Sequence, residues 1–349
     1  MKIALICPSN IIYMPYVNNY KKILEEYNVC YDIINWDRFN IENLNKGYTY
    51  KDSKIGHKRN FTDYLKYKKF IEQKLYTQKY DKIIIFGIQL SYFLKSTLLR
   101  KFKDKYIVDI RDFNKIIKFF KFKKLLQNSS YVVISSHGYR EWLPRSEKII
   151  INHNMAKNTL ENIEYSKRIF EKDTLNIACI GAIRDYEINV NLINSLKNNE
   201  KFKVCFYGEG VINGDIEEYS KMKNIKNVEL TGRYEPKEER SLYMKSDLIN
   251  VLRYNDGINN KTALPNRLYN SAVYGIPMIA FKGTELSKYI EKYNLGLVLE
   301  SFDEIEYQIN KYVKEFEVEK YNRLRMGFLE EVIKENSIFE EKIKNFIMK

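Results

Sequence analysis

The most informative stretch of the chain is residues 253–277, which read RYNDGINNKTALPNRLYNSAVYGIP. Apolar, strand-like runs lie on both sides of it, and a polar loop leads through Pro265 into a helical pattern. Gly275 is expected to cap this helix and Pro277 to stop it, because glycine favours the C-cap conformation and proline cannot continue a helix. The stretch therefore predicts a strand, a loop, a helix and a second strand, the repeating unit of a parallel α/β sheet.

The same alternation of short apolar runs and longer helical patterns extends along the whole chain, which favours βαβ units and parallel sheets. Helices are expected in the gaps, for example over residues 190–198 and 268–274, and residues 316–349 read as helices. The expected strands are residues 3–7, 29–35, 82–86, 106–109, 131–135 and 148–152 in the first half and 176–180, 203–207, 228–231, 248–252, 278–281 and 296–299 in the second. The sequence thus predicts an α/β fold of two Rossmann-like, doubly wound domains facing a central cleft, with ligands beyond the carboxyl ends of the strands.

The length of 349 residues also favours two domains, because it is long for a single core. We expect an N-terminal domain over residues 1–155, a polar linker over residues 156–173 and a C-terminal domain over residues 174–330. Residues 331–349 are expected to form a C-terminal helix that can pack back on the N-terminal domain.

The composition is that of a folded protein with an excess of basic residues. The 59 lysines and arginines exceed the 45 acidic residues, and the net charge is +14. This charge suits an anionic partner such as a nucleotide, nucleic acid or an acidic membrane, although the codon bias of an AT-rich genome explains it equally well. The four cysteines are far apart, which is typical of small core residues in a reducing compartment. No apolar run approaches the roughly 20 residues of a membrane span, so we expect a cytoplasmic protein that could associate with the inner face of the membrane.

Several motifs are missing from the sequence, and their absence narrows the function. There is no P-loop, and Gly208-Glu-Gly210 lacks the third glycine of a dinucleotide-binding fingerprint. There is no D-x-D pair to hold a divalent ion on a diphosphate, and the three histidines do not have the spacing of metal ligands. We therefore expect neither a cofactor nor a metal, so that any leaving diphosphate must be neutralised by the protein itself.

Residues 253–277 offer such a neutralising site. A loop that runs into the start of a helix presents free N–H groups and the positive end of the helix dipole, which together bind phosphate. Lys261 and Arg267 would add full charges beside it. Fixed donors and cations aimed at the charge that grows on a leaving diphosphate can replace a metal.

The segment LPNRLYNSAVYGIPMIA, residues 264–280, resembles the donor-site segment of GT-B glycosyltransferases related to family 4, which make capsular and other surface polysaccharides. The order of NIACIG (176–181), FYGEG (206–210) and VELTGR (228–233) is similar to the same family, as is VISSHG (133–138) in the first half. The resemblance implies transfer of a hexose or related sugar from a nucleotide-diphosphate donor, in the first place a UDP-sugar. It also implies a glycan or lipid-linked glycan acceptor and retention of the anomeric configuration.

The donor site is expected in the second half of the chain. Arg184 follows a strand end, where α/β proteins bind their ligands. The resemblance places Asn270 at the ribose and the pair Arg233-Tyr234 near the base. The alternatives are solvated loop side chains for the cations and an ordinary turn glycine for Gly208. The full set of candidate donor residues is Gly181, Arg184, Gly208, Arg233, Tyr234, Arg253, Lys261, Leu264, Pro265, Asn266, Arg267 and Asn270.

The sequence departs from the family pattern at two places. Thr262 and Asn270 stand where many members carry two glutamates eight positions apart, so the usual carboxylates at the donor sugar and ribose are absent. Many members also carry a lysine shortly after the Gly-Arg that opens the second domain, and no lysine stands in register after Arg184. Lys261 or Arg267 can supply the missing charge.

Candidate residues of the first domain follow strand ends as well. Asp112 is a candidate catalytic or acceptor-orienting carboxylate, with a helix N-cap as its competing role. His137 follows a buried strand and could orient the acceptor or the donor phosphate, although a lone histidine is more often structural. Ser9 and Asn10, in the loop after the first strand, are candidates for acceptor binding.

A basic stretch over residues 114–128 reads as a helix. Lys115, Lys118 and Lys121 share one face with Phe122, and apolar groups among lysines suit an anionic membrane surface. The alternative is a helix that is buried on one face and rimmed by solvated lysines.

Three other functions compete with sugar transfer. A sugar-nucleotide 2-epimerase on the same fold would need carboxylates and histidines for proton transfer. A catalytically degenerate GT-B subunit that binds another transferase is favoured by the missing glutamates. A nucleic-acid binder is suggested by charge alone and by no recognised motif, so no nucleic-acid partner is expected.

Overall fold

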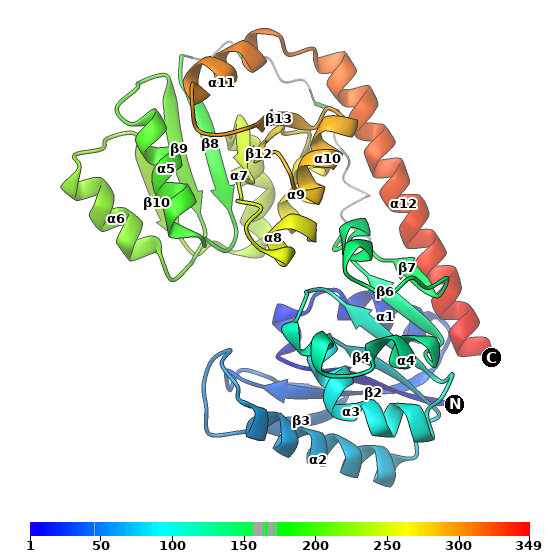
Figure 1. Ribbon diagram of the computed structural model, residues 1–349. Helices are drawn as coiled ribbons and strands as arrows, with labels where there is room; N and C mark the ends of the chain where they lie inside the picture. The colour runs from blue at the N-terminus through cyan, green and yellow to red at the C-terminus, as the bar shows by residue number, and fades with distance from the viewer. Residues whose placement is uncertain (45, 156–162, 164, 167–169, 171–172) are drawn as a thin grey trace. The chain divides into compact units, whose positions relative to one another are not determined.

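The structure is a computed structural model that describes residues 1–44, 46–155, 163, 165–166, 170 and 173–349. It divides into two compact units (Figure 1). The N-terminal unit comprises the described residues of Met1–Ala156 and Ile333–Lys349, and the C-terminal unit those of Lys157–Val332. The expected linker, residues 156–173, lies almost wholly outside the described residues.

The N-terminal unit is built on a parallel sheet of seven strands in the order β3-β2-β1-β4-β5-β6-β7. Its inner strands β4 and β5 are buried along their whole length, as expected for parallel strands between layers of helices. The strands are β1 (Lys2–Cys7), β2 (Cys30–Asp37), β3 (Gly47–Lys51), β4 (Lys82–Phe86), β5 (Tyr106–Ile110), β6 (Tyr131–Ile134) and β7 (Ile149–Ile151). The helices are α1 (Val17–Glu26), α2 (Phe61–Gln78), α3 (Ile88–Lys101) and α4 (Phe122–Gln127), with 3-10 turns η1 (Ile11–Tyr13), η2 (Lys115–Phe119) and η3 (His137–Glu141).

The C-terminal unit repeats this plan with a parallel sheet of six strands in the order β10-β9-β8-β11-β12-β13. The strands are β8 (Leu175–Ile180), β9 (Phe202–Tyr207), β10 (Val228–Gly232), β11 (Leu248–Asn250), β12 (Met278–Phe281) and β13 (Gly296–Leu299). The helices are α5 (Tyr186–Leu196), α6 (Asn213–Met222), α7 (Glu239–Lys245), α8 (Ile258–Thr262), α9 (Asn266–Tyr274), α10 (Glu285–Lys292) and α11 (Ile305–Lys314), with a 3-10 turn η5 (Pro236–Glu238).

The longest helix, α12 (Val318–Met348), contributes residues to both units. Its last part places Phe339 and Ile343 in the core of the N-terminal unit, where the same apolar cluster includes Ile3 of β1. At the end of the helix, Lys82 donates a hydrogen bond to the carbonyl oxygen of Phe346. The final turns of the chain are therefore part of the N-terminal core.

The predicted fold class is confirmed, since both sheets are parallel and doubly wound. Every expected strand is present, with ends within two residues of the prediction. Sequence analysis missed β3, an edge strand that pairs only with β2 and has no buried residue, so it lacks an apolar run. In α9, Gly275 forms the C-cap with a positive φ of 71°, as the sequence predicts.

Candidate functional site

At the carboxyl edge of the C-terminal sheet, the loops after β8 and β9 pack backbone against backbone. The N–H of Gly181 donates to the carbonyl oxygen of Tyr207 at 2.8 Å, and Gly181 and Gly208 have φ angles of +102° and +145°. A Cβ atom on Gly208 would lie 1.9 Å from the Gly181 carbonyl oxygen, and one on Gly210 would lie 1.8 Å from that of Ile183. Packing of the two loops therefore accounts for Gly208 and Gly210 without a ligand.

Gly208→Ala is expected to lower the free energy of unfolding by about 2–4 kcal/mol, because the methyl group would clash with a carbonyl and the backbone angle is strained for other residues. Urea unfolding followed by circular dichroism measures the loss. Gly214→Ala in α6 is the matched control, since no atom beyond its chain neighbours and the adjacent backbone of α6 lies within 4 Å of its Cβ position. The control should be neutral or slightly stabilising, and an equal loss in both variants would contradict the packing explanation.

Two arginines with free side chains follow strands at the same edge. Arg184, after β8, and Arg233, after β10, are exposed, and neither side chain forms an ion pair or hydrogen bond within the described part of the chain. The backbone of Arg184 is held by Asn189, whose Nδ2 donates to the Arg184 carbonyl oxygen at 2.6 Å. A guanidinium that is free of carboxylates keeps its full charge available for an anion.

Arg267, in the first turn of α9, reaches back over two strand ends. Its Nη1 donates to the carbonyl oxygen of Asn250 in β11 at 2.8 Å and lies 2.9 Å from the Sγ of Cys179 in β8. The helix begins after Pro265, which gives it no side-chain cap, and its first turn contains no acidic residue. Its first N–H groups, which lack acceptors within a helix, therefore lie beside a fixed guanidinium.

The loop between β11 and α9 carries the other basic candidates. Arg253 Nη1 donates to the carbonyl oxygen of Ala263 at 3.2 Å, and Lys261 is exposed on the short helix α8. Thr262, at one of the two positions where the resemblance leads us to expect a glutamate, is buried, and its Oγ1 donates at 2.6 Å to a carbonyl of its own helix. In this chain, the Thr262 hydroxyl is therefore used for a hydrogen bond within α8 itself.

Sequence analysis missed a carboxylate at this edge, Glu239 at the start of α7. Tyr234 donates its hydroxyl to Glu239 Oε1 at 3.1 Å, and burial raises the pKa of Glu239. Burial also raises the pKa of Tyr234, while the charge of Arg267 acts to lower it. Burial raises the pKa of Tyr243 on α7, and the Asn270 side chain acts to lower it. Nothing in the sequence marks Glu239, because its position depends on the packing of α7 beside α9.

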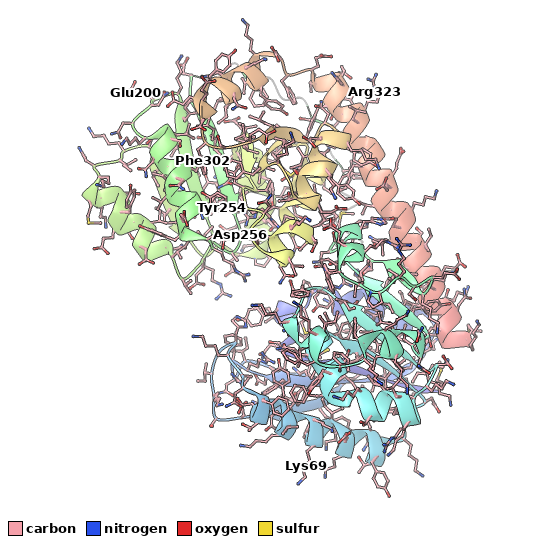
Figure 2. The ribbon with its side chains drawn as sticks, viewed as in Figure 1. Lys69, Glu200, Tyr254, Asp256, Phe302 and Arg323 are labelled. Atoms are coloured by element: carbon pink, nitrogen blue, oxygen red, sulfur yellow. The ribbon has the colours of Figure 1, made fainter. Side chains whose placement is uncertain are left out.

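The structure brings the candidate donor residues to one edge of the C-terminal sheet, because parallel strands all end at the same edge. Leu264 and Gly208 differ from the others in being buried, and Leu264 anchors the loop. Figure 2 labels Asp256 on this edge and Glu200 on the opposite edge, where β9 begins. The residues collected here are Gly181, Arg184, Gly208, Arg233, Tyr234, Arg253, Lys261, Pro265, Asn266, Arg267 and Asn270.

The N-terminal unit has a small hollow of about 150 Å³ beyond the ends of β1, β4 and β5. Asp112, which is exposed, borders it together with Pro8 and Gln89. An N-cap was the alternative role for Asp112. The N-cap of η2 is instead Asn114, whose side chain accepts a hydrogen bond from the N–H of Ile116. Asp112 thus stays a candidate acceptor-orienting carboxylate at the rim of this hollow.

Next to Asp112 in the chain, Arg111 forms a buried ion pair with Asp109. Arg111 donates from Nε and Nη2 to the carboxylate of Asp109 at 2.6 and 2.7 Å, and Tyr20 donates its hydroxyl to the same carboxylate at 2.6 Å. Arg111 also bonds the backbone and side-chain oxygens of Asn152, each at 2.8 Å. Burial lowers the pKa of Arg111, but Asp109 outweighs this effect and raises the pKa above its ordinary value.

The structure corrects the assignment of Asn10 as an acceptor contact. Asn10 is fully buried, donates from Nδ2 to Asp37 at 2.6 Å and accepts from the N–H of Arg38 at 2.9 Å. The hydroxyl of Ser9 is buried as well. Asn10 therefore fixes the loop after β1. The Ser9 hydroxyl has no hydrogen-bond partner among the described residues, and neither polar group is exposed to an acceptor.

His137 is held by a residue from the other end of the sequence. Its Nε2 lies 2.6 Å from Glu335 Oε1 of α12, and the Nε2 of the buried His153 lies 2.7 Å from Glu335 Oε2. Burial would raise the pKa of Glu335, but the hydrogen bonds with His137 and His153 outweigh it and lower the pKa to about 2. His137 thus anchors α12 in the N-terminal unit, a structural role that the sequence left open.

Glu335→Gln is expected to destabilise the protein by about 2 kcal/mol near neutral pH, because a half-buried carboxylate between two histidines loses its charge. A carboxyl group whose pKa is lowered by folding stabilises the protein above its unfolded pKa and loses this effect as the pH falls through the folded value. The difference from wild type should therefore shrink between the ordinary pKa of 4.5 and about 2. Urea unfolding at several pH values measures it, with the exposed Glu330→Gln as control. A difference that is constant with pH would contradict the role of the Glu335 charge.

The lysine-rich stretch over residues 114–128 is not one helix. It forms the 3-10 turn η2 and the short helix α4, and Phe122 is buried in the N-terminal unit, which corrects its assignment as a membrane contact. Lys115, Lys118 and Lys121 are exposed, and the exposed aromatic residue beside them is Phe119, with 74% of its surface accessible. The break at residues 120 and 121 turns Phe122 inward and Phe119 outward.

Two further observations apply to the residues that the structure describes. Within them, no group of three or more His, Cys, Asp or Glu side chains could hold a metal ion. None of their helices is long and apolar enough to cross a bilayer.

The two doubly wound sheets define a class of fold, the GT-B fold of glycosyltransferases, and solved structures of this class are similar to the chain over nearly its whole length. The sucrose-phosphate synthase of Thermosynechococcus elongatus is similar over 99% of this chain and 94% of its own, with a TM-score of 0.70 at 13% identity. The lipopolysaccharide outer core galactosyltransferase WaaB is similar over 100% and 99%, with a TM-score of 0.69 at 14% identity. HepE from Anabaena, in complex with UDP and glucose, is similar over 99% and 100%, with a TM-score of 0.68 at 11% identity. No family model matches the chain, and no curated protein matches its sequence.

Proposed function

We propose that the protein transfers a sugar from a nucleotide-diphosphate donor, bound at the carboxyl edge of the C-terminal sheet, to a glycan or lipid-linked glycan. The observation that carries this proposal is the position of Arg267, whose guanidinium is fixed over the ends of β8 and β11 at the start of α9. A cation at a helix N-terminus is unfavourable unless an anion lies between them. The free guanidinium groups of Arg184 and Arg233 supply further charge at the same edge.

These residues suit a diphosphate leaving group without a metal. In the reaction, the bond between the sugar C1 and the diphosphate oxygen breaks and a bond from C1 to an acceptor hydroxyl oxygen forms, while the proton of that hydroxyl passes to the departing diphosphate. Negative charge grows on the diphosphate, and Arg184, Lys261 and Arg267 together with the first N–H groups of α9 would stabilise it. We propose UDP as the nucleotide, supported by the similarity to HepE with UDP and glucose. Retention of configuration is proposed on the resemblance to family 4.

The donor proposal is tested by offering UDP-, GDP- and TDP-sugars to the purified protein without acceptor. We expect a rise in melting temperature with at least one of them and slow hydrolysis of the donor. Because we expect no metal to take part, EDTA should change neither the rise in melting temperature nor the rate of donor hydrolysis. A protein that responds to no nucleotide would contradict the proposal.

A catalytically inactive GT-B subunit is the second candidate, and the burial of Thr262 at a glutamate position favours it. The same experiment separates the two, because an inactive subunit would bind nucleotide without hydrolysis or transfer. Conversion of one free UDP-sugar into its epimer would instead identify a 2-epimerase.

We also propose that η2 contacts an anionic membrane surface through the exposed Phe119 and the lysines beside it. The double variant Lys118→Glu/Phe119→Ser should bind vesicles that contain phosphatidylglycerol at least about tenfold more weakly, because it loses an apolar anchor and reverses a charge. Sedimentation with vesicles measures the binding. Lys69→Glu, an exposed lysine on α2 (Figure 2), is the control for charge alone. Equal loss in both variants would contradict a localised contact.

A further inference from the structure

Three aromatic rings meet in the N-terminal unit beyond the ends of β1 and β2. The ring centroids of Tyr13 and Phe39 lie 4.9 Å apart, those of Phe39 and His57 4.7 Å, and those of Tyr13 and His57 5.5 Å. Tyr13 is 48% exposed, His57 is exposed and Phe39 is half-buried. Tyr13, Phe39 and His57 are called the ring platform below.

The loop that carries Tyr13 is fixed by buried polar contacts. Besides the bonds of Asn10 described above, the N–H of Ile11 donates to Glu42 Oε2 at 2.9 Å, and Asn35 Nδ2 donates to the same oxygen at 2.7 Å. Tyr13 closes the turn by donating its N–H to the carbonyl oxygen of Asn10 at 3.1 Å. Tyr13 is therefore exposed on a rigid turn.

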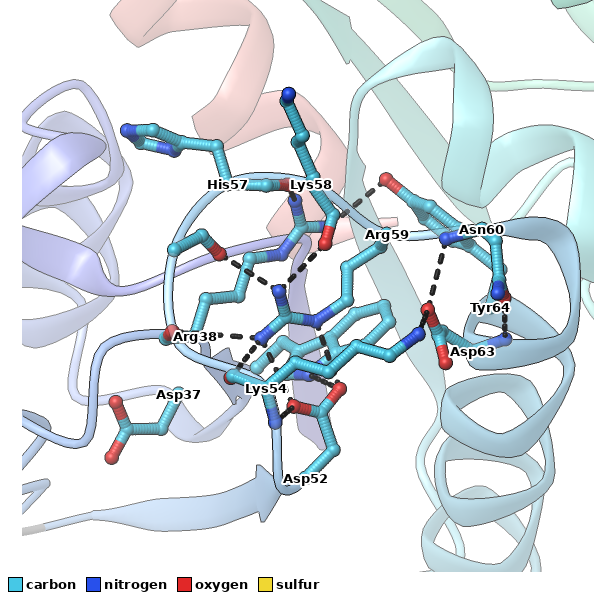
Figure 3. A network of polar contacts seen from close by, with 12 residues as sticks. Asp37, Arg38, Asp52, Lys54, His57, Lys58, Arg59, Asn60, Asp63 and Tyr64 are labelled. Atoms are coloured by element: carbon cyan, nitrogen blue, oxygen red, sulfur yellow. Dashed lines mark hydrogen bonds and ion pairs between the residues drawn. The ribbon is translucent and has the colours of Figure 1, made fainter.

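The loop that carries His57 is fixed as firmly, and Figure 3 shows its polar network. Arg59 points into the loop, with only 1% of its side chain exposed, and donates to both carboxylate oxygens of Asp52 at 2.8 and 3.0 Å. It also donates to the carbonyl oxygens of Lys54 at 2.6 Å and Gly56 at 2.8 Å. The loop therefore closes around one buried guanidinium.

Arg38 links this loop to the hollow beside Asp112. Its Nη1 donates to the carbonyl oxygen of His57 at 3.0 Å, and its Nη2 donates to the hydroxyl of Tyr64 at 2.9 Å. Tyr64 in turn donates to Gln89 Oε1 at 2.9 Å, and Gln89 borders the hollow. Hydrogen bonds therefore join the loop of His57 to the rim of the hollow, and both lie at the carboxyl edge of the sheet, where α/β proteins bind ligands.

The side chains of the ring platform and of the neighbouring hollow indicate the chemical class of a ligand that could bind there. Aromatic rings offer apolar faces, and the C–H face of a sugar ring is an apolar surface of matching size. Gln89 and Asp112 carry planar polar groups that can hydrogen-bond sugar hydroxyls from the side. Loops that are already rigid lose little conformational entropy when a ligand binds.

We propose that the ring platform stacks on a sugar ring of the acceptor. The proposal rests on the proposed glycosyltransferase function and deepens it, because it names the surface and the chemical class by which the acceptor is recognised. Tyr13 and His57 contribute their exposed rings, and the half-buried Phe39 packs against both of them.

The test measures sugar binding and nucleotide binding separately. The probes are a panel of methyl glycosides and short oligosaccharides of glucose, galactose, N-acetylglucosamine and rhamnose, detected by saturation-transfer NMR, and UDP, detected by calorimetry. Wild type should bind at least one sugar. Tyr13→Ala and His57→Ala should each weaken this binding roughly three- to tenfold, while Tyr13→Phe, which keeps the ring, should bind as wild type does. UDP affinity should be unchanged in all variants, and Tyr76→Ala, an exposed tyrosine on α2, is the control.

The proposal would be overturned by sugar affinity that is unchanged in Tyr13→Ala and His57→Ala, or by UDP binding in a wild-type protein that binds no sugar of the panel. The second result would leave the donor proposal standing. Tyr13-dependent sugar binding without any nucleotide binding would support the platform and remove the transferase proposal. Loss of vesicle binding, and not of sugar binding, in Tyr13→Ala would assign the rings to a membrane and also overturn the proposal.

Discussion

Replacing Arg111 by alanine is expected to lower the free energy of unfolding by about 3–5 kcal/mol, because it leaves the carboxylate of Asp109 buried without a counter-charge. Asp109 is fully buried at the end of β5, and Arg111 supplies two of its hydrogen bonds. Arg111 also holds both oxygens of Asn152, after β7. Its loss should therefore loosen the carboxyl edge of the N-terminal sheet as well as reduce stability.

Urea unfolding followed by far-UV circular dichroism measures this effect. Arg100→Ala, an exposed arginine in the last turn of α3, is the matched control and should change the free energy by less than about 0.5 kcal/mol. The double variant Asp109→Asn/Arg111→Met should recover at least half of the loss, since it removes both charges. A loss below about 1 kcal/mol in Arg111→Ala would show that Asp109 finds another partner.

Arg267→Ala is expected to weaken the binding of UDP about 10- to 100-fold, because a charge-assisted hydrogen bond to phosphate contributes about 1.5–3 kcal/mol. The guanidinium is held in place by Asn250 and Cys179, so it has little conformational freedom to lose when an anion binds. Calorimetric titration of UDP measures the affinity. Arg267→Lys should recover only part of it, since an ammonium group cannot form the same forked contact.

Uridine distinguishes a phosphate contact from general damage to the site. Its affinity should be the same in wild type and Arg267→Ala, because it has no phosphate for the guanidinium to bind. Arg323→Ala changes an exposed arginine on α12 in the same unit (Figure 2) and should leave UDP binding unchanged. Equal losses for UDP and uridine would place Arg267 outside the phosphate site.

The strands of the protein other than β3 could be predicted because each is marked by an apolar run within its own few residues. The run KIIIF, for example, predicts β4 by itself, since a parallel strand is buried on both faces and reads as continuously apolar. The edge strand β3 has no such run and was missed. The predicted helix over residues 114–128 was wrong in its middle, because the chain turns there to bury Phe122, a tertiary contact that outweighs helical periodicity.

The candidate donor residues could be located because strand order decides which residues reach the carboxyl edge. Arg184 and Arg267 follow directly from that rule, one after β8 and the other at the start of α9. Glu239 does not, because only the packing of α7 brings its carboxylate to Tyr234. Asn10 occupies a predicted site position yet is buried, because its amide satisfies Asp37 and the backbone of Arg38.

By itself, the sequence determined the two doubly wound domains and the strand ends at which Arg184, Lys261 and Arg267 lie. Both depend on interactions between near neighbours in the chain, which periodicity and turn residues record. Only the tertiary structure decided the partners of individual side chains, such as the pairing of His137 with Glu335 across 198 positions or the meeting of Tyr13 with His57. These contacts depend on how whole elements pack, and no local pattern of residues records that.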